Sequence, residues 1–275
     1  MKRAVLILFW IFATTLVASA QTTFFYPHVL NGGLGIVTWR TTIILTNPTS
    51  TTAVGAITFT KDNPDLIASG STWALALTDQ NAFTITSSVF SFTLPPGATR
   101  KWVTSSTGGL ISGFANVTTN AGIVTGTAIF SEYDFNGNLV AEAGVPAATP
   151  VLRQTILVDT LAKYGVGVAY ANPGTSTANI SLTLLDDNGA VVAGPATETM
   201  GSGNHTQGFV SEFFRSAPPL VGTMQISSST PLVAVALRFD PTLSKFTTLP
   251  AVTLTSLINN GLTAIKTLLE TFKLV

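Results

Sequence analysis

The chain contains the same phrase twice, and this repeat constrains its fold more than any other feature of the sequence. Residues 44–60 read ILTNPTSTTAVGAITFT, and residues 169–185 read AYANPGTSTANISLTLL. Each copy runs from an apolar segment through Asn-Pro and small polar residues to a second segment with alternating apolar positions. Proline has no backbone N–H for a strand ladder, and it keeps the preceding residue extended. The phrase is therefore typical of a strand, a turn and a second strand.

A second block repeats further along the chain, which indicates that a whole module is duplicated. Asn47 matches Asn172, 125 residues later, whereas residues 110–130 parallel residues 220–239, 110 residues later. The first copy therefore carries about 15 more residues between the two blocks, and we place this insertion near residues 62–83. A repeat this long indicates two domains rather than a short-period solenoid. The chain of 275 residues is long enough for two cores.

Both copies have the composition of β-structure. Short segments rich in Val, Ile, Thr and Phe alternate with Pro- and Gly-containing turns, for example at residues 37–45, 55–60, 89–94, 100–104, 111–118 and 123–131. Many short strands with frequent turn signals favour a β-sandwich. We predict an all-β protein with two tandem immunoglobulin-like β-sandwiches, module 1 at residues 21–150 and module 2 at residues 151–252.

The N-terminal segment has the pattern of an export signal. Lys2 and Arg3 precede an apolar stretch at residues 4–17, and Ala18-Ser19-Ala20 offers a small-x-small cleavage site. We predict a signal peptide at residues 1–20 and an exported protein at the cell surface, in the periplasm or outside the cell. The alternative is that the segment is retained as a membrane anchor. Contact with a membrane is expected only in that case.

The C-terminal segment has a helical pattern. Residues 253–275 are predicted to form an amphipathic helix, because apolar residues recur there at spacings of four and three. Such a stripe must be buried, either on module 2 or on another polypeptide, and a position in a membrane interface is the third option. We therefore predict an interaction surface at Ile258, Leu262, Ile265, Leu269 and Phe272.

The first module resembles the start of a tandem β-sandwich module found in exported bacterial proteins of mostly unknown function. The shared features are Tyr26-Pro27, the turn at residues 31–33, Thr41-Thr42, and Leu45 followed by Asn47-Pro48. The AGVP stretch at 143–146 and the TTLP stretch at 247–250 close the two modules in a similar way. The resemblance covers roughly residues 24–250. It implies immunoglobulin-like sandwiches at the cell surface and supplies no catalytic residues.

Charge and motif content exclude several classes of function. The chain has 13 basic and 13 acidic residues, and the basic ones form no cluster that would bind nucleic acid. His28 and His205 occupy non-equivalent positions and form no pair with the spacing of metal ligands. No nucleophile elbow, phosphate loop or dinucleotide fingerprint is present. We therefore predict a protein that is not an enzyme and needs no cofactor.

Two further features are weak candidates for binding sites. Asp186 and Asp187, and separately Asp134, lie in acidic turns whose oxygens could bind calcium, although solvated hairpin turns explain them as well. Trp73 lies in the insertion and could stack on a sugar or enter a partner, or instead cap one end of the sandwich core.

The combined features favour an exported structural or assembly protein, a subunit or accessory component of a surface or periplasmic assembly. It would bind a protein partner or itself through the C-terminal helix and through sheet edges with few charges. One alternative is an adhesin or carbohydrate-binding module that uses the Trp73 insertion. Another is an accessory subunit of a membrane complex with an uncleaved N-terminal anchor.

Overall fold

The computed structural model describes residues 22–254, and this part of the chain is all-β, as predicted. The predicted signal or anchor segment and residues 255–275 of the predicted C-terminal helix, with Ile258, Leu262, Ile265, Leu269 and Phe272, lie outside the described residues. The predicted start of that helix is wrong, because Thr253 belongs to a short strand at Val252–Thr253. The helical elements within residues 22–254 are a single 3-10 turn and one short α-helix. Neither is long and apolar enough to cross a membrane.

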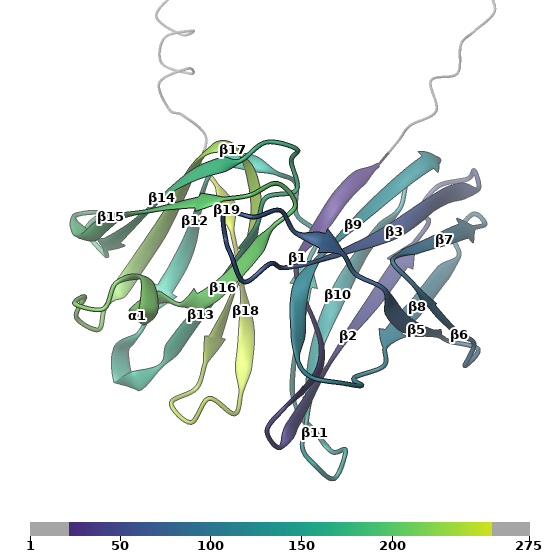
Figure 1. Ribbon diagram of the computed structural model, residues 1–275, viewed down its shortest axis with the longest axis horizontal. Helices are drawn as coiled ribbons and strands as arrows, with labels where there is room; N and C mark the ends of the chain where they lie inside the picture. The colour runs from purple at the N-terminus through teal and green to yellow at the C-terminus, as the bar shows by residue number, and fades with distance from the viewer. Residues whose placement is uncertain (1–21, 255–275) are drawn as a thin grey trace, which may run out of the picture.

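Eleven strands build module 1, the purple to teal half of Figure 1. Their bounds are β1 Thr23–Leu34, β2 Val37–Thr46, β3 Ala53–Lys61, β4 Ser71–Thr72, β5 Leu75–Asp79, β6 Thr84–Ser87, β7 Val89–Leu94, β8 Thr99–Thr104, β9 Ile111–Ala121, β10 Thr125–Tyr133 and β11 Leu139–Pro146.

Eight strands build module 2, which lies beside module 1 in Figure 1. Their bounds are β12 Val151–Asp159, β13 Gly165–Ala171, β14 Ala178–Asp186, β15 Val191–Met200, β16 His205–Phe209, β17 Val221–Phe239, β18 Phe246–Pro250 and β19 Val252–Thr253, with the 3-10 turn η1 Leu161–Lys163 and the helix α1 Val210–Phe213 between them.

Each module is a β-sandwich-like unit in which one long strand belongs to two layers. In module 1, the first part of β1 pairs with β9 and its end pairs with β2. In module 2, the first half of β17 pairs with β12 and β14, and its second half pairs with β13 and β18. Such a strand carries the hydrogen-bonded network from one layer to the other, so each module is a single connected sheet, of 11 and 8 strands respectively.

The two modules share one antiparallel pairing scheme. The pairings of β9 with β1 and β3, of β3 with β7, of β2 with β8 and β10, and of β10 with β11 all recur in module 2. There they join β17 with β12 and β14, β14 with β15, β13 with β16 and β17, and β17 with β18. Ile57 lies opposite Val117 and Leu182 opposite Ile226, so in the structure the second block is displaced by 109 residues, one fewer than in the sequence alignment. The sequence repeat is therefore a repeat of three-dimensional structure.

The insertion lies between β3 and β7 of module 1. Residues 62–88 carry the short strands β4, β5 and β6, whereas the matching connection in module 2 is the tight turn at residues 187–190. The β5–β6 hairpin extends the layer that contains β8. Module 1 is therefore wider than module 2 on the side that faces away from the junction (Figure 1).

Each module has its own apolar core, and a third set of contacts joins them. Tyr26, Phe59 and Phe130 are fully buried in module 1, and Tyr170 and Leu182 are fully buried in module 2. Strand alternation produces these cores, as in β7, where every second residue is buried. At the junction, the apolar residues of module 2 that join the core cluster of module 1 are Ala169, Val235, Leu237 and Phe246.

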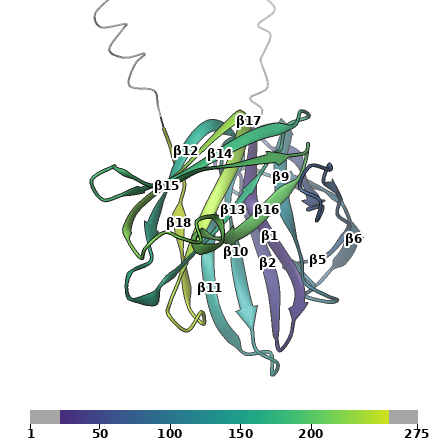
Figure 2. The same cartoon turned by 60° about the vertical axis from the view of Figure 1, so that its left-hand side comes forward.

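Further contacts along the junction tie the two modules to each other. Trp39 of β2 stacks on Phe246 of β18 with ring centroids 5.6 Å apart. Next to this stack, the Lys245 ammonium donates to the carbonyl of Val140, and the Thr248 hydroxyl donates to the carbonyl of Gly144. Strands β11 and β18 therefore cover each other's edges. Figure 2 shows β13 and β16 in front of β1, in agreement with the contacts between β1 and β13.

Candidate functional site

In module 1 the repeated asparagine, which we call the staple asparagine, fixes its turn through hydrogen bonds of its side chain. Asn47 is fully buried, and its side-chain amide donates to the carbonyls of Thr51 and Leu94 at 2.7 and 2.9 Å. Its side-chain oxygen accepts from the backbone N–H of Thr49 at 3.0 Å. The residue thus closes its own turn and ties it to the end of β7. This geometry supports the structural interpretation of the Asn-Pro phrase.

Asn172 makes the same contacts in module 2. Its side-chain amide donates to the carbonyls of Ser176 at 2.8 Å and Gly201 at 3.1 Å, and its oxygen accepts from the N–H of Gly174 at 3.1 Å. Its backbone N–H donates to the carbonyl of Asn204, where Asn47 donates to the carbonyl of Ala98. Residues 98 and 204 are therefore equivalent positions of the two modules.

Residues 62–70, which we call the junction loop, leave module 1 and lie against module 2. Asn204 is fully buried, and its two amide N–H groups are shared among the carbonyls of Ala68 at 3.0 Å and of Asp65 and Leu66 at 3.1 Å. Its side-chain oxygen accepts from the N–H of Asn63 at 2.8 Å. One asparagine of module 2 therefore holds a loop of module 1, which crosses between the modules in Figure 1.

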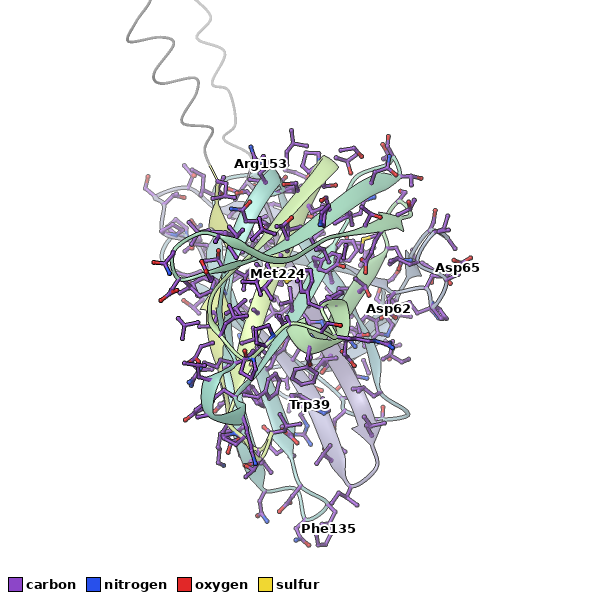
Figure 3. All side chains as sticks on the ribbon, turned by 90° about the vertical axis from the view of Figure 1, so that its left-hand side faces the viewer. Trp39, Asp62, Asp65, Phe135, Arg153 and Met224 are labelled. Atoms are coloured by element: carbon purple, nitrogen blue, oxygen red, sulfur yellow. The ribbon has the colours of Figure 1, made fainter. Side chains whose placement is uncertain are left out.

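Close backbone contact completes this attachment. The N–H of Gly70 donates to the carbonyl of Ser202, and the N–H of Gly201 donates to the carbonyl of Leu66. A Cβ on Gly70 would lie 1.8 Å from the carbonyl oxygen of Gly203, so only glycine fits there. Figure 3, which looks onto module 2, shows Asp62 and Asp65 of the junction loop at its edge.

A β-bulge turns His28 toward module 2. The pairing of β1 with β9 shifts register between Tyr26 and Val29, so Pro27 and His28 lie opposite a single residue of β9. Proline has no N–H for the ladder, and a bulge re-aims the adjacent side chain. His28 lies edge-on to Phe130 at 5.1 Å and is 7% exposed. A module 1 histidine thus reaches the junction.

The two histidines of the chain meet at this junction. Nδ1 of His28 lies 2.9 Å from Nε2 of His205, the first residue of β16, with the rings stacked. Nδ1 of His205 has no hydrogen-bond partner at ordinary distance, but it lies 3.6 Å from Oδ2 of Asp62 in the junction loop. That same oxygen accepts a 2.5 Å hydrogen bond from the Ser112 hydroxyl. Four polar residues from both modules therefore form one chain of contacts.

Burial controls the protonation of the titratable side chains in this row of contacts. It lowers the pKa of the His28 imidazole well below its usual value, and His205 adds to the effect. Burial also lowers the pKa of His205, against the opposing effect of Asp62. For Asp62, burial would raise the carboxyl pKa, but His205 and Ser112 outweigh it and the pKa is lowered. At neutral pH both imidazoles are therefore neutral and Asp62 is a carboxylate.

The order of the contacts does not fit a nucleophilic triad or a metal site. In a triad the serine hydroxyl contacts the imidazole, whereas Ser112 contacts the carboxylate of Asp62. Within residues 22–254, no group of three or more His, Cys, Asp or Glu side chains is arranged to hold a metal ion. The contacts between Asp62, His205 and His28 do set the tautomers of the two imidazoles. The nearby carboxylate favours a proton on Nδ1 of His205, so Nε2 of His205 accepts from Nδ1–H of His28.

A cavity of about 250 Å³ adjoins His28, and we call it the His28 cavity. Among the described residues that line it, only His28 comes from module 1. Phe209 and Phe239 supply aromatic rings, and their centroids lie 5.4 Å apart. The remaining lining comes from β13, the β16–α1 segment and the second half of β17: Gly167, Val168, Ala169, Gln207, Gly208, Glu212, Val235 and Leu237.

A second hollow, which we call the edge groove, lies at the opposite end of module 1. It has a volume of about 400 Å³ and lies between the β5–β6 hairpin and β7. Phe83 and Ile85 line it and are 64% and 48% exposed, and Val89 is exposed beside them. Among the described strands, β6 pairs only with β5, and β7 pairs only with β3. Two unpaired strand edges therefore flank a groove whose lining combines apolar side chains with the charged residues Asp79 and Arg100.

Trp73 lies in the core. It is 4% exposed, and its backbone N–H donates to the carbonyl of Phe59. The indole is a member of the module 1 core cluster. Its ring face is therefore covered in this conformation, which favours the core interpretation over a surface that stacks on a sugar.

The calcium candidates are turn residues whose carboxylates accept backbone hydrogen bonds. Oδ1 of Asp134 accepts from the N–H groups of Asn136 and Asn138 at 2.9 and 2.8 Å. Oδ1 of Asp186 does the same for Asn188 and Ala190, whereas Oδ1 of Asp187 accepts from the side chain of Asn188. Hydrogen bonds from Asn138 lower the pKa of the Asp134 carboxyl. The structure brings Asp134 and Asp186 to different hairpins, so they form no common site.

Sequence reasoning missed the histidine contact and the Asn204 attachment. His28 and His205 occupy unrelated positions in the sequence, yet the structure brings them into contact across 177 positions. The Pro27-His28 pair inside an apolar strand is a signal for a bulge, although it does not identify the partner of His28. No local signal marks Asn204, because its partners lie more than 130 positions away.

Comparison with known proteins adds no assignment. No family model matches the chain, and no curated protein matches it either.

Proposed function

We propose that the chain is an exported, non-enzymatic subunit of a cell-surface or periplasmic assembly, built from two immunoglobulin-like β-sandwich modules. Its partner at the edge groove is a second copy of the same chain. The observation that carries the proposal is that β6 and β7 each have one unpaired edge beside the exposed Phe83, Ile85 and Val89.

The contrast between strand edges supports this proposal. At the junction, β11 and β18 cover each other, whereas β6 and β7 face outward at the end of module 1 farthest from module 2 (Figure 1). Neither β6 (TITS) nor β7 (VFSFTL) carries a charged residue. Charged side chains, proline and bulges normally protect exposed edges from pairing with another chain. Strand edges that carry no charge of their own, beside a groove with exposed Phe83 and Ile85, suit the addition of a strand.

A second copy is a suitable occupant because β6 can pair with itself. An antiparallel pair of identical strands is related by a two-fold axis, which gives a closed dimer. With Ile85 on the two-fold axis, Ile85 would face its own equivalent and Thr84 would face Thr86 of the other copy, without like charges. The non-enzymatic part of the proposal draws on the contact order Ser112–Asp62–His205, which does not activate a serine.

The first experiment is the native mass of the chain from residue 21, measured by light scattering over a range of concentrations. We expect a dimer or a larger oligomer that Ile85→Lys shifts toward the monomer, because a buried unpaired charge opposes strand pairing. Leu157→Lys is the matched control, since Leu157 is 57% exposed on a strand of module 2. Its oligomer should resemble that of the unmodified chain.

A chain that ends at residue 254 separates the two proposed contacts. If the predicted C-terminal helix also contributes, the truncated chain should associate more weakly and Ile85→Lys should weaken it further. A monomer at every concentration for the unmodified chain would contradict self-association through the edge groove. The partner would then have to be a different protein.

Two alternatives remain distinguishable by experiment. The carbohydrate-binding alternative gains no support from Trp73, whose indole is buried. Glycan binding that Phe83→Ala removes would favour it. An uncleaved anchor would be revealed by a mature protein that begins at Met1 rather than near Gln21, and this result would favour an accessory subunit of a membrane complex.

A further inference from the structure

The His28 cavity exists because small residues line one face of β13. Val166, Val168 and Tyr170 point into the core of module 2. The alternate residues Gly165, Gly167, Ala169 and Ala171 face the other way, toward module 1. Module 1 covers only part of this β13 face, which carries only Gly and Ala residues.

Side chains of module 1 cover the β13 face at Ala169 and Ala171 but leave it open at Gly167. Phe25 and Phe114 pack on Ala171, and Ala169 joins the module 1 core cluster. At Gly167 the nearest groups are the rings of Phe239 and Phe209, at 3.2 and 3.9 Å from the position of a Cβ. The space beside Gly167 is therefore lined by aromatic and aliphatic groups.

One polar atom is directed at this space without a partner. Nδ1 of His28 contacts His205, so Nε2 is its remaining ring nitrogen, and it makes no hydrogen bond with the described residues. The contact chain from Asp62 keeps Nε2 of His28 unprotonated, so it is an acceptor. His28 is 93% buried as a residue and lines the cavity, but Nε2 is not among the fully buried atoms without a partner, so it is open to the cavity and to a hydrogen-bond donor there. Glu212, which also lines the cavity, is already engaged by the N–H of Phe209 at 2.6 Å.

We infer that the His28 cavity is a binding site for a small aromatic alcohol, a phenol whose hydroxyl donates to Nε2 of His28. The volume fits, because a dry cavity of roughly 150 Å³ lined by apolar groups takes benzene. The cavity of about 250 Å³ has room for a ring with a small substituent. A pocket between domains that is mostly apolar and has a few polar groups is typical of small-molecule sites, and here the polar side chains are His28, Gln207 and Glu212. The site is partly open, so a ligand can enter without separating the modules.

The test compares two probes of nearly equal shape on the full mature chain by isothermal titration calorimetry at pH 7.5. Para-cresol has the hydroxyl donor, whereas 4-methylanisole has the same ring and no donor. We expect para-cresol to bind with a Kd below about 1 mM and 4-methylanisole to bind at least about tenfold more weakly. Equal affinities, or no heat from either probe, would overturn the inference.

Two variants locate the binding. Gly167→Val extends a side chain into the cavity between Phe209 and Phe239 and should abolish binding of para-cresol. Its matched control is Gly144→Val on β11, where a Cβ would meet only the Thr127 hydroxyl at 3.9 Å. That control should bind para-cresol as the unmodified chain does. If Gly167→Val is folded and still binds para-cresol, the ligand lies elsewhere and the inference fails.

His28→Phe tests the polar contact while keeping an aromatic ring. It should remove the preference for para-cresol over 4-methylanisole, so that the two affinities differ by less than about threefold. A preference that survives in this variant would rule out His28 as the acceptor. If the variant does not fold, the comparison of the two probes on the unmodified chain still decides the question.

Discussion

Residue 98 of module 1 and residue 204 of module 2 occupy the same place in the fold but have different roles. Each accepts the backbone N–H of the staple asparagine, Asn47 or Asn172, at 2.9 Å. Ala98 has no polar side chain, whereas Asn204 makes hydrogen bonds with the backbone of the junction loop of module 1. The two modules therefore share the hydrogen bonds that close the Asn-Pro turns. They differ at residues 98 and 204, because only Asn204 binds a loop of the other module.

The difference extends to the rest of the insertion. The first part, residues 62–70, is attached to module 2, and the second part, with β5 and β6, forms the outward end of module 1. Module 2 has only a tight turn at the corresponding connection. The insertion thus supplies both the link between the modules and the edge groove.

Removal of the Asn204 side chain should have the largest effect. Asn204→Ala leaves the N–H of Asn63 without its partner and removes the two amide N–H groups shared by carbonyls of the junction loop, and we expect a loss of about 3 kcal/mol in unfolding free energy. Urea denaturation measures it. Asn179→Ala, at an exposed asparagine of β14, should cost less than about 0.5 kcal/mol. A loss at Asn204 as small as at Asn179 would show that the loop attachment carries no stability.

Substitution of either repeated asparagine should lower the unfolding free energy by a similar amount. Asn47→Ala and Asn172→Ala each remove an equivalent buried set of hydrogen bonds, so we expect losses of about 2 kcal/mol for each. Thermal and urea unfolding would measure both. Losses that differ by more than about 1.5 kcal/mol would show that the two turns are not energetically equivalent. The same contacts would then contribute differently to the unfolding free energy.

The histidine pair should make the junction sensitive to pH. Burial lowers the pKa of His28 and of His205, so the unfolded chain takes up protons below about pH 6.5 while the folded chain does not. Stability should therefore fall by about 1–2 kcal/mol between pH 7 and pH 5.5. Asp62, whose pKa is lowered, contributes stability that is lost only at more acidic pH, as the pH falls through its folded-state value.

The control for this prediction is the double variant His28→Gln and His205→Gln, whose stability should change less over the same pH range. Glu132, whose pKa is raised by burial, acts in the opposite direction, because its neutral form is favoured in the folded state. The comparison with the double variant removes this contribution. An equal pH dependence in both proteins would show that the histidines do not cause it.

Calcium should have the smallest effect. The carboxylates of Asp134 and Asp186 already accept backbone N–H groups in their turns, so addition of 5 mM calcium should shift the Tm by less than about 1 °C. Differential scanning calorimetry measures this directly, with magnesium as the control ion. A shift of several degrees that Asp186→Asn removes would restore a calcium site in module 2.

Local chemistry explains what could be predicted of the fold. The β-strands, the turns at Asn47-Pro48 and Asn172-Pro173, and the duplication depend on residues close together in sequence. Alternation and the missing N–H of proline act within a few residues, so their signals survive without a structure. Trp73 shows the limit, because the same local pattern fits an exposed or a buried indole, and only the packing of β3 and β5 around it covers the ring.

The sequence by itself determined the all-β class, the repeat and the place of the insertion. Only the tertiary structure decided that His28 meets His205, that Asn204 holds the junction loop, and that β13 leaves a cavity beside Gly167. These contacts join residues 136–177 positions apart. Their formation depends on how two finished modules pack, and no periodicity within either module records that packing.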